Sequence, residues 1–306
     1  MPTPSVATHA RTRPHWPLAT VLPLLLWLGA CQPETAPPIA PTAGGETPAE
    51  AVIGLTAHLR SGDLARFARD AVPVALAAPL DAAWREGRTR WPLTELPLSG
   101  QLAPALTALG APQAERALLQ AFNRQFAGAD RELRSTAIAL GVFATQYLEH
   151  DGAFSDAERA HYTQLVAALG DWAARAPLAD RAHAHTTING LVEAARQGGI
   201  DSDEALGQAG MEAGLTALSP LYVAGKRHLR AYGLDLDMAF DSVEVTLIEQ
   251  TGDVARVRLQ YLLAGRPVDA VLDVERLEGR WYVTDFVRHA RAAADAAPPA
   301  AAAATS

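Results

Sequence analysis

The chain has 306 residues, a net charge of −8 and a single cysteine, Cys31. This length is sufficient to bury one or two hydrophobic cores. Phosphate backbones are bound by clustered lysine and arginine, so the acidic balance argues against nucleic acid as a partner. A single cysteine excludes a disulfide within the chain. We expect no cofactor, because the sequence contains no phosphate loop, dinucleotide fingerprint or His-Glu-x-x-His motif.

Residues 1–30 have the pattern of a secretory signal peptide. They include two arginines and no acid, and a 13-residue apolar run extends from Leu18 to Ala30. A basic start, a short apolar middle and small residues at the exit are typical of a cleaved export signal. A membrane-spanning helix is the weaker interpretation, because such a helix needs about 20 apolar residues and Pro23 interrupts this run.

The apolar run ends in Leu28, Gly29, Ala30 and Cys31, which resemble the lipobox of bacterial lipoproteins. This resemblance implies that a signal peptidase recognises the first three residues and cleaves before Cys31. It also implies that the cysteine receives a diacylglyceryl group and a fatty acyl chain such as palmitate. The lipid bilayer is then a partner, and the chain is anchored to a membrane facing the periplasm. An aspartate after the cysteine retains such proteins at the inner membrane, so Gln32 implies the outer membrane. The alternative is an ordinary signal peptide followed by an unmodified cysteine.

Low-complexity segments lie on both sides of the region expected to fold. Residues 31–50 contain five prolines and a Gly44-Gly45 pair, which predicts a disordered, semi-rigid tether. Residues 290–306 are mostly alanine and proline, and we expect a frayed helix and a disordered tail.

Residues 51–233 are predicted to be mainly helical. Apolar side chains recur at helical spacing, and Asp63 is placed to cap a helix after a Ser-Gly break. Residues 87–100 contain glycines and prolines and are expected to form a loop. The last helix of this region is expected to run from Pro220 to Tyr232. Abundant alanine allows close helix–helix approach, which favours a compact bundle.

Residues 234–289 are predicted to form a four-stranded antiparallel meander. Apolar and polar residues alternate in four segments, and glycine-containing turns separate them. Arg256 and Arg258 should stand near Asp269 and Asp273 on the charged face of the sheet. The complete fold expected is α+β, in which a helical bundle precedes an antiparallel β-meander, after the signal peptide and proline-rich tether.

The meander and its closing segment, residues 277–286, are similar to the sheet of nuclear-transport-factor-like cone domains. Residues 59–67 are similar to the first helix pair of the same family. If both similarities hold, a helical insertion at roughly residues 80–215 separates the two parts of the domain. The family includes enzymes, ligand-binding proteins and accessory modules, so the resemblance does not choose a function.

Asp285 is the centre of the catalytic hypothesis. It alternates with Trp281 and Val283, which predicts that it points to the apolar face of the last strand. A buried aspartate has a raised pKa and could act as a general base, together with Tyr261 and His289. The alternative is a strand-end aspartate that is hydrogen-bonded to neighbouring groups or exposed.

Glu149, Asp151 and Glu158 form the candidate metal site. A glycine and a glutamate are spaced as in a calcium-binding EF-hand loop, but the first ligand position is a tyrosine. Ser155 and Glu158 also form a complete capping box for the helix that follows, and we favour this interpretation.

From these patterns we expect a membrane-anchored periplasmic lipoprotein that acts as a non-enzymatic binding or accessory module of the cell envelope. An envelope protein is the other partner considered. The alternative is a small-molecule-binding or hydrolytic cone-like domain with a pocket around Asp285. A packed core around Val257, Tyr261 and Asp285 would favour the accessory module.

Overall fold

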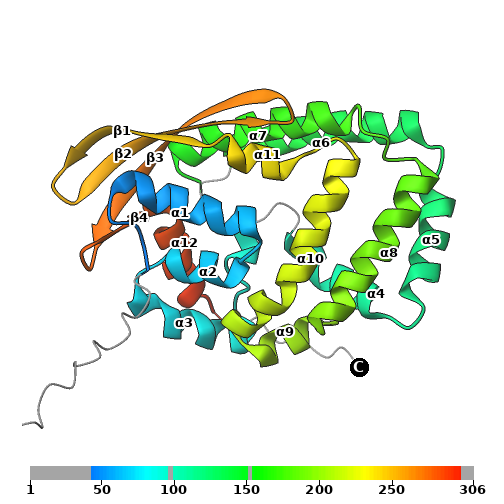
Figure 1. Cartoon of the computed structure of the whole chain (residues 1–306), viewed down its shortest axis with the longest axis horizontal. Helices are drawn as coiled ribbons and strands as arrows, with labels where there is room; N and C mark the ends of the chain where they lie inside the picture. The colour runs from blue at the N-terminus through cyan, green and yellow to red at the C-terminus, as the bar shows by residue number, and fades with distance from the viewer. Residues whose placement is uncertain (1–42, 96–98, 151–153, 298–306) are drawn as a thin grey trace, which may run out of the picture. The chain divides into compact units, whose positions relative to one another are not determined.

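The computed structural model describes residues 43–95, 99–150 and 154–297. Helices dominate the chain as far as residue 241, and a four-stranded sheet and one further helix follow (Figure 1). The α+β prediction is therefore confirmed. The α-helices are α1 (Pro48–Ser61), α2 (Leu64–Asp70), α3 (Val74–Arg85), α4 (Leu102–Gly110), α5 (Ala114–Gln125), α6 (Asp130–His150), α7 (Asp156–Ala173), α8 (Arg181–Gly198), α9 (Asp203–Ala209), α10 (Met211–Ala231), α11 (Leu236–Asp241) and α12 (Thr284–Ala294).

Short polar side chains fix where many of these helices begin. Thr47 accepts a hydrogen bond from the Glu50 backbone N–H, and the Glu50 carboxylate accepts one from the Thr47 backbone. Asp63 caps α2 as expected, by accepting from the Arg66 backbone N–H. Such caps satisfy amide groups that have no partner within the helix.

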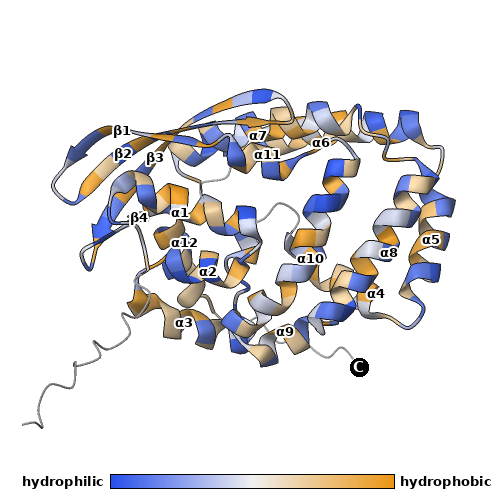
Figure 2. Cartoon of the chain, viewed as in Figure 1, coloured by the Kyte–Doolittle hydropathy of each residue, from blue (hydrophilic) through white to orange (hydrophobic). Residues whose placement is uncertain are grey.

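The sheet is an antiparallel meander in the order β1 (Glu244–Thr251), β2 (Val254–Leu263), β3 (Arg266–Leu277) and β4 (Arg280–Val283). The register pairs Val257 with Leu272, and the alternation of burial along β2 gives the sheet one apolar and one polar face. On the polar face Arg258 forms an ion pair with Asp269 at 2.8 Å, as the sequence predicts. Figure 2 shows this alternation as orange and blue segments along the strands.

Helices α1, α7, α11 and α12 cover the apolar face of the sheet. The main core joins this face to α2, α3 and α10, and Trp84 and Trp91 are completely buried in it. The described part of the chain from residue 43 onward belongs to one compact unit, so the bundle and the sheet share a core. None of the helices in this part of the chain is both long and apolar enough to span a membrane.

The end of the sheet differs from the prediction. Strand β4 ends at Val283, and Asp285 and Val287 belong to α12 rather than to the last strand. The alternating pattern therefore stops three residues earlier than expected from Trp281, Val283 and Val287. The chain bends into a helix here because Val287 and Ala290, which are buried at helical spacing, pack against the sheet and α3.

Both predicted disordered segments are shorter than expected. Within 31–50, Ala43 is buried, Gly45 pairs with Trp281, and α1 begins at Pro48; the rest of that range lies outside the described residues. Within 290–306, Ala290 is completely buried and α12 continues to Ala294. Small side chains that appear too small to fold are used here to fit close to other elements.

Candidate functional site

Five ionisable side chains converge where the start of α7 meets α12, and we call them the charged cluster. Three carboxylates and two basic groups form it, and they come from three separate parts of the chain. Its members are Glu95, Glu158, Asp285, Arg288 and His289.

Two short structural elements place these side chains. Ser155 caps α7 by accepting from the Glu158 backbone N–H, and the Glu158 carboxylate accepts from the Ser155 backbone at 2.8 Å. The capping-box interpretation is therefore confirmed. On α12, Asp285, Arg288 and His289 are spaced three and four residues apart, so they project from one side of the helix.

His289 lies between two carboxylates. Its Nδ1 is 2.5 Å from an Oε atom of Glu95, which belongs to the short 3-10 helix η1 (Leu93–Glu95), and its Nε2 is 3.3 Å from Glu158. The hydrogen bond to Glu95 is the main cause of a raised His289 pKa, and the charge of Glu158 adds to it, while burial opposes both. With an acceptor at each ring nitrogen, the imidazolium form donates two hydrogen bonds.

Arg288 and Ser155 complete the pairing. Arg288 donates to Glu158 at 2.5 Å and to Asp285 at 3.0 Å. The Ser155 hydroxyl donates to the other oxygen of Asp285 at 3.0 Å. Both carboxylate oxygens of Asp285 thus accept hydrogen bonds from protein groups, as do those of Glu158.

Tyr261 makes its contact outside the charged cluster. Its hydroxyl is 2.8 Å from Nε2 of His161 on α7. Burial lowers the pKa of His161 to about 4 and raises the pKa of Tyr261, so both groups are neutral at pH 7. Burial also raises the pKa of the neighbouring Tyr162, and the charges of Glu158, Glu95 and Asp285 raise it further. The neutral pair and the charged cluster therefore lie on adjacent parts of α7.

The structure brings two of the three catalytic candidates together and corrects their setting. Asp285 and His289 share the charged cluster, but Asp285 lies in the first turn of α12 and not on the apolar face of a strand. Tyr261 is hydrogen-bonded to His161 instead. Val257, at the centre of the sheet, is completely buried in a packed core. The arrangement neutralises charge and joins α12 to α7; it does not present Asp285 as a base facing an open cavity.

The metal candidates are divided in the same way. Glu158 is used in the charged cluster, Glu149 is exposed near the end of α6, and Asp151 lies outside the described residues. No three histidine, cysteine, aspartate or glutamate side chains gather as metal ligands within 43–95, 99–150 and 154–297.

Sequence reasoning missed Glu95 and Arg288. Glu95 lies in the segment expected to be a loop, and nothing local indicates its partner nearly 200 residues away. Arg288 could have been found, because Asp285, Arg288 and His289 have helical spacing. Reading these positions as the end of a strand concealed that pattern.

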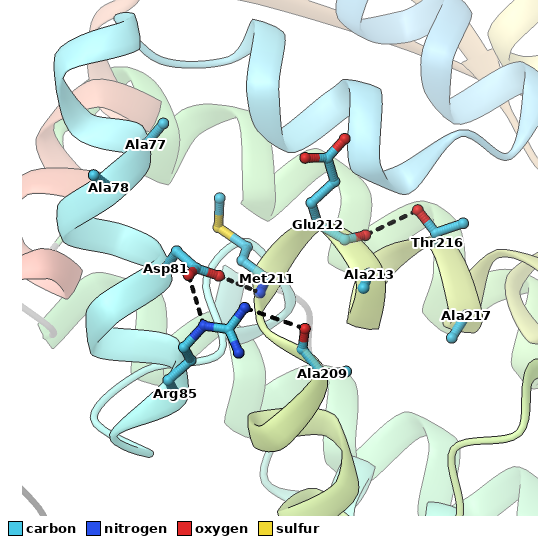
Figure 3. A pocket seen from close by; sticks show the side chains of 10 residues that line it. All are labelled: Ala77, Ala78, Asp81, Arg85, Ala209, Met211, Glu212, Ala213, Thr216 and Ala217. Carbon is cyan, nitrogen blue, oxygen red and sulfur yellow. Dashed lines mark hydrogen bonds and ion pairs between the residues drawn. The ribbon is translucent and has the colours of Figure 1, made fainter.

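A groove of about 780 Å³ between α3 and the start of α10 is the other candidate site. Figure 3 shows Asp81 and Arg85 pointing toward each other and toward the turn before Met211. Asp81 accepts from the Met211 backbone N–H at 2.8 Å and from Arg85, and Arg85 donates to the Gln208 carbonyl. The rest of the lining is mostly alanine. The polar groups of this groove therefore attach α10 to α3.

No family model, curated protein or solved structure matches this chain.

Proposed function

We propose that the protein is a bacterial lipoprotein, anchored through acylated Cys31 to a membrane facing the periplasm, and that its folded unit is a non-enzymatic accessory module of the envelope. The observation that carries the proposal is the sequence Leu28–Cys31 at the end of a short apolar run with a basic start. A diacylglyceryl group and a further acyl chain provide the two or more hydrophobic attachments that stable anchoring requires.

The interior of the folded unit supports the accessory role. Val257 is completely buried, Tyr261 is bonded to His161, and Asp285 is bonded to Ser155 and Arg288. These contacts fill the region where a cone-type enzyme would need an open pocket. The groups proposed to do acid–base chemistry instead stabilise the contact between α7 and α12.

Metabolic labelling with a radioactive fatty acid tests the anchor. We expect the full chain to incorporate label and to fractionate with the outer membrane, and Cys31→Ala to lose both properties. Label retained in Cys31→Ala, or an unlabelled parent chain, would contradict lipidation.

Gln32→Asp is the matched control for this experiment. It changes the residue beside the lipidated cysteine but leaves the cysteine itself. We expect this variant to be labelled as fully as the parent and to move to the inner membrane. Loss of label in Gln32→Asp would show that the substitution, rather than the missing sulfur, prevents processing.

A further inference from the structure

Helix α6 is the most exposed long helix of the fold. Among its residues only Leu148 is buried, and its main contact is with α7. Yet the exposed side of the helix is strongly apolar: Ile138, Leu140, Val142 and Phe143 are between 55% and 67% exposed. In Figure 2 the middle of α6 is coloured as hydrophobic. These side chains form an apolar patch on the order of several hundred Å², a size that marks interaction sites.

The charges on α6 are arranged symmetrically around this patch. Arg131 and Glu149 are 18 residues apart, which is about five turns of 3.6 residues, so both lie on the same side of the helix. Ile138 and Val142 occupy the same side between them. The intervals from Arg131 to Ile138, Val142 and Glu149 are seven, four and seven residues, and the stripe is therefore symmetric in spacing about residue 140.

Both end charges are free to meet another molecule. Arg131 and Glu149 are exposed, and neither forms an ion pair with any residue in the described part of the chain. They have opposite sign and stand at opposite ends of one apolar stripe. A second helix with the same stripe, running in the opposite direction, would satisfy both.

We propose that the exposed face of α6 binds the same face of a second copy of this chain, with the two helices antiparallel about a two-fold axis near residue 140. Arg131 then lies opposite Glu149 of the partner subunit, and Ile138 lies beside the partner's Val142. A two-fold interface is self-complementary in this way. A stable interface covers about 800 Å² per partner, so the apolar patch forms its centre and the charged ends contribute to its rim.

The composition of α6 favours a protein over a lipid surface as the occupant. Helices that lie on membranes carry many lysines and arginines on their polar face. α6 has no lysine, and its two arginines are balanced by Asp130, Glu132 and Glu149. Opposite charges at fixed positions specify a register, which a lipid surface does not require.

Thiol crosslinking in the full chain tests the contact. Ala139 is a small exposed residue beside the two-fold axis, and we would replace it by cysteine. Cells expressing Ala139→Cys are treated with a short bis-maleimide, and the dimer fraction is measured on a denaturing gel. Val74→Cys, at an equally exposed position on α3, is the matched control. The parent chain measures any crosslinking through Cys31 itself, which keeps this result separate from the lipidation proposal.

We expect a dimer band with Ala139→Cys and none above background with Val74→Cys or the parent. In the Ala139→Cys chain, Arg131→Glu creates two like-charge contacts and should lower the dimer fraction roughly tenfold. Adding Glu149→Arg restores opposite charges and should restore the band. Circular dichroism of both charge variants checks that the monomer remains folded.

Two results would overturn the proposal. One is the absence of an Ala139→Cys dimer above the Val74→Cys control. The other is a dimer whose amount does not change when Arg131 is reversed, or does not recover when Glu149 is reversed with it. A lipid-bound α6 would give the first result, and a heterologous contact between copies would give the second.

Discussion

Protonation of His289 is linked to folding through its two carboxylate neighbours. Its pKa is raised above the unfolded value of about 6.5, chiefly by Glu95. A group with a raised pKa stabilises the fold fully below its unfolded pKa, and this stabilisation is lost as the pH rises through the folded pKa. The contact between α12 and α7 is therefore strongest under mildly acidic conditions.

We predict that His289→Gln lowers the free energy of unfolding by about 1–3 kcal/mol at pH 5–6, because it removes an imidazolium between two carboxylates. The difference from the parent should become smaller as the pH rises above 7. Denaturant unfolding of both proteins over this pH range measures it. His185→Gln is the control, since the ring of this exposed histidine contacts Asn189 and no carboxylate among the described residues. A deficit that is constant with pH would contradict the imidazolium assignment.

At the scale of elements, helices α8 and α10 approach most closely where glycine replaces a side chain. A Cβ atom on Gly198 would lie 2.1 Å from the backbone oxygen of Ala217 on α10, and one on Gly190 would lie 2.2 Å from His228. A backbone atom cannot move aside as a flexible side chain can. The separation of these two helices is therefore set at Gly198.

We predict that Gly198→Ala destabilises the fold by about 2–3 kcal/mol, because α8 and α10 must move apart. Gly225→Ala on α10 is the matched control: nothing lies within 4 Å of its added Cβ, and alanine favours the helix by about 0.5–1 kcal/mol. Chemical denaturation of the two variants should show shifts of opposite sign. Equal effects would mean that helix propensity, rather than contact between the helices, decides the outcome.

The elements themselves were largely predictable from local patterns, and their ends were less so. The cap at Asp63 and the Arg258–Asp269 pair are where the sequence predicts them. The expected helix start at Pro220 is wrong: α10 begins at Met211 and continues through the proline. Proline is common in a first turn, so its local signal indicates a start. Packing against α8 and α2, together with the contact of Asp81 at Met211, maintains the longer helix.

The charged cluster was less accessible to prediction than the fold. Its α12 members have a recognisable spacing once the helix is known, whereas the approach of Glu95 depends on the complete tertiary structure. Long-range contacts between polar groups leave no periodic signal. Candidate residues could therefore be proposed singly, but their partners could not.

At the scale of the whole molecule, the first described residues hold the last strand. Gly45 and Trp281 exchange two backbone hydrogen bonds of 2.9 Å, and the Tyr282 hydroxyl donates to the Ala43 carbonyl. Ala43, Tyr282 and Val287 form a small buried cluster. These contacts are why residues 43–47 belong to the fold and not to the tether.

We predict that a chain truncated to begin at residue 46 loses about 2–4 kcal/mol of stability relative to one that begins at residue 43. Both chains retain the Thr47–Glu50 capping box, so the comparison isolates the contacts of residues 43–45. Thermal or chemical unfolding of the two chains provides the measurement. Equal stability would show that these residues are dispensable.

The pairing of Gly45 with Trp281 also constrains the order of folding. The first helix packs on a strand formed by nearly the last residues of the chain, so the sheet cannot close over α1 until β4 has been synthesised. Contacts between such distant segments slow folding and leave apolar surface exposed in the meantime. A nascent chain would therefore remain incompletely folded until its C-terminal end is available, which is the state in which a polypeptide is threaded through a narrow channel.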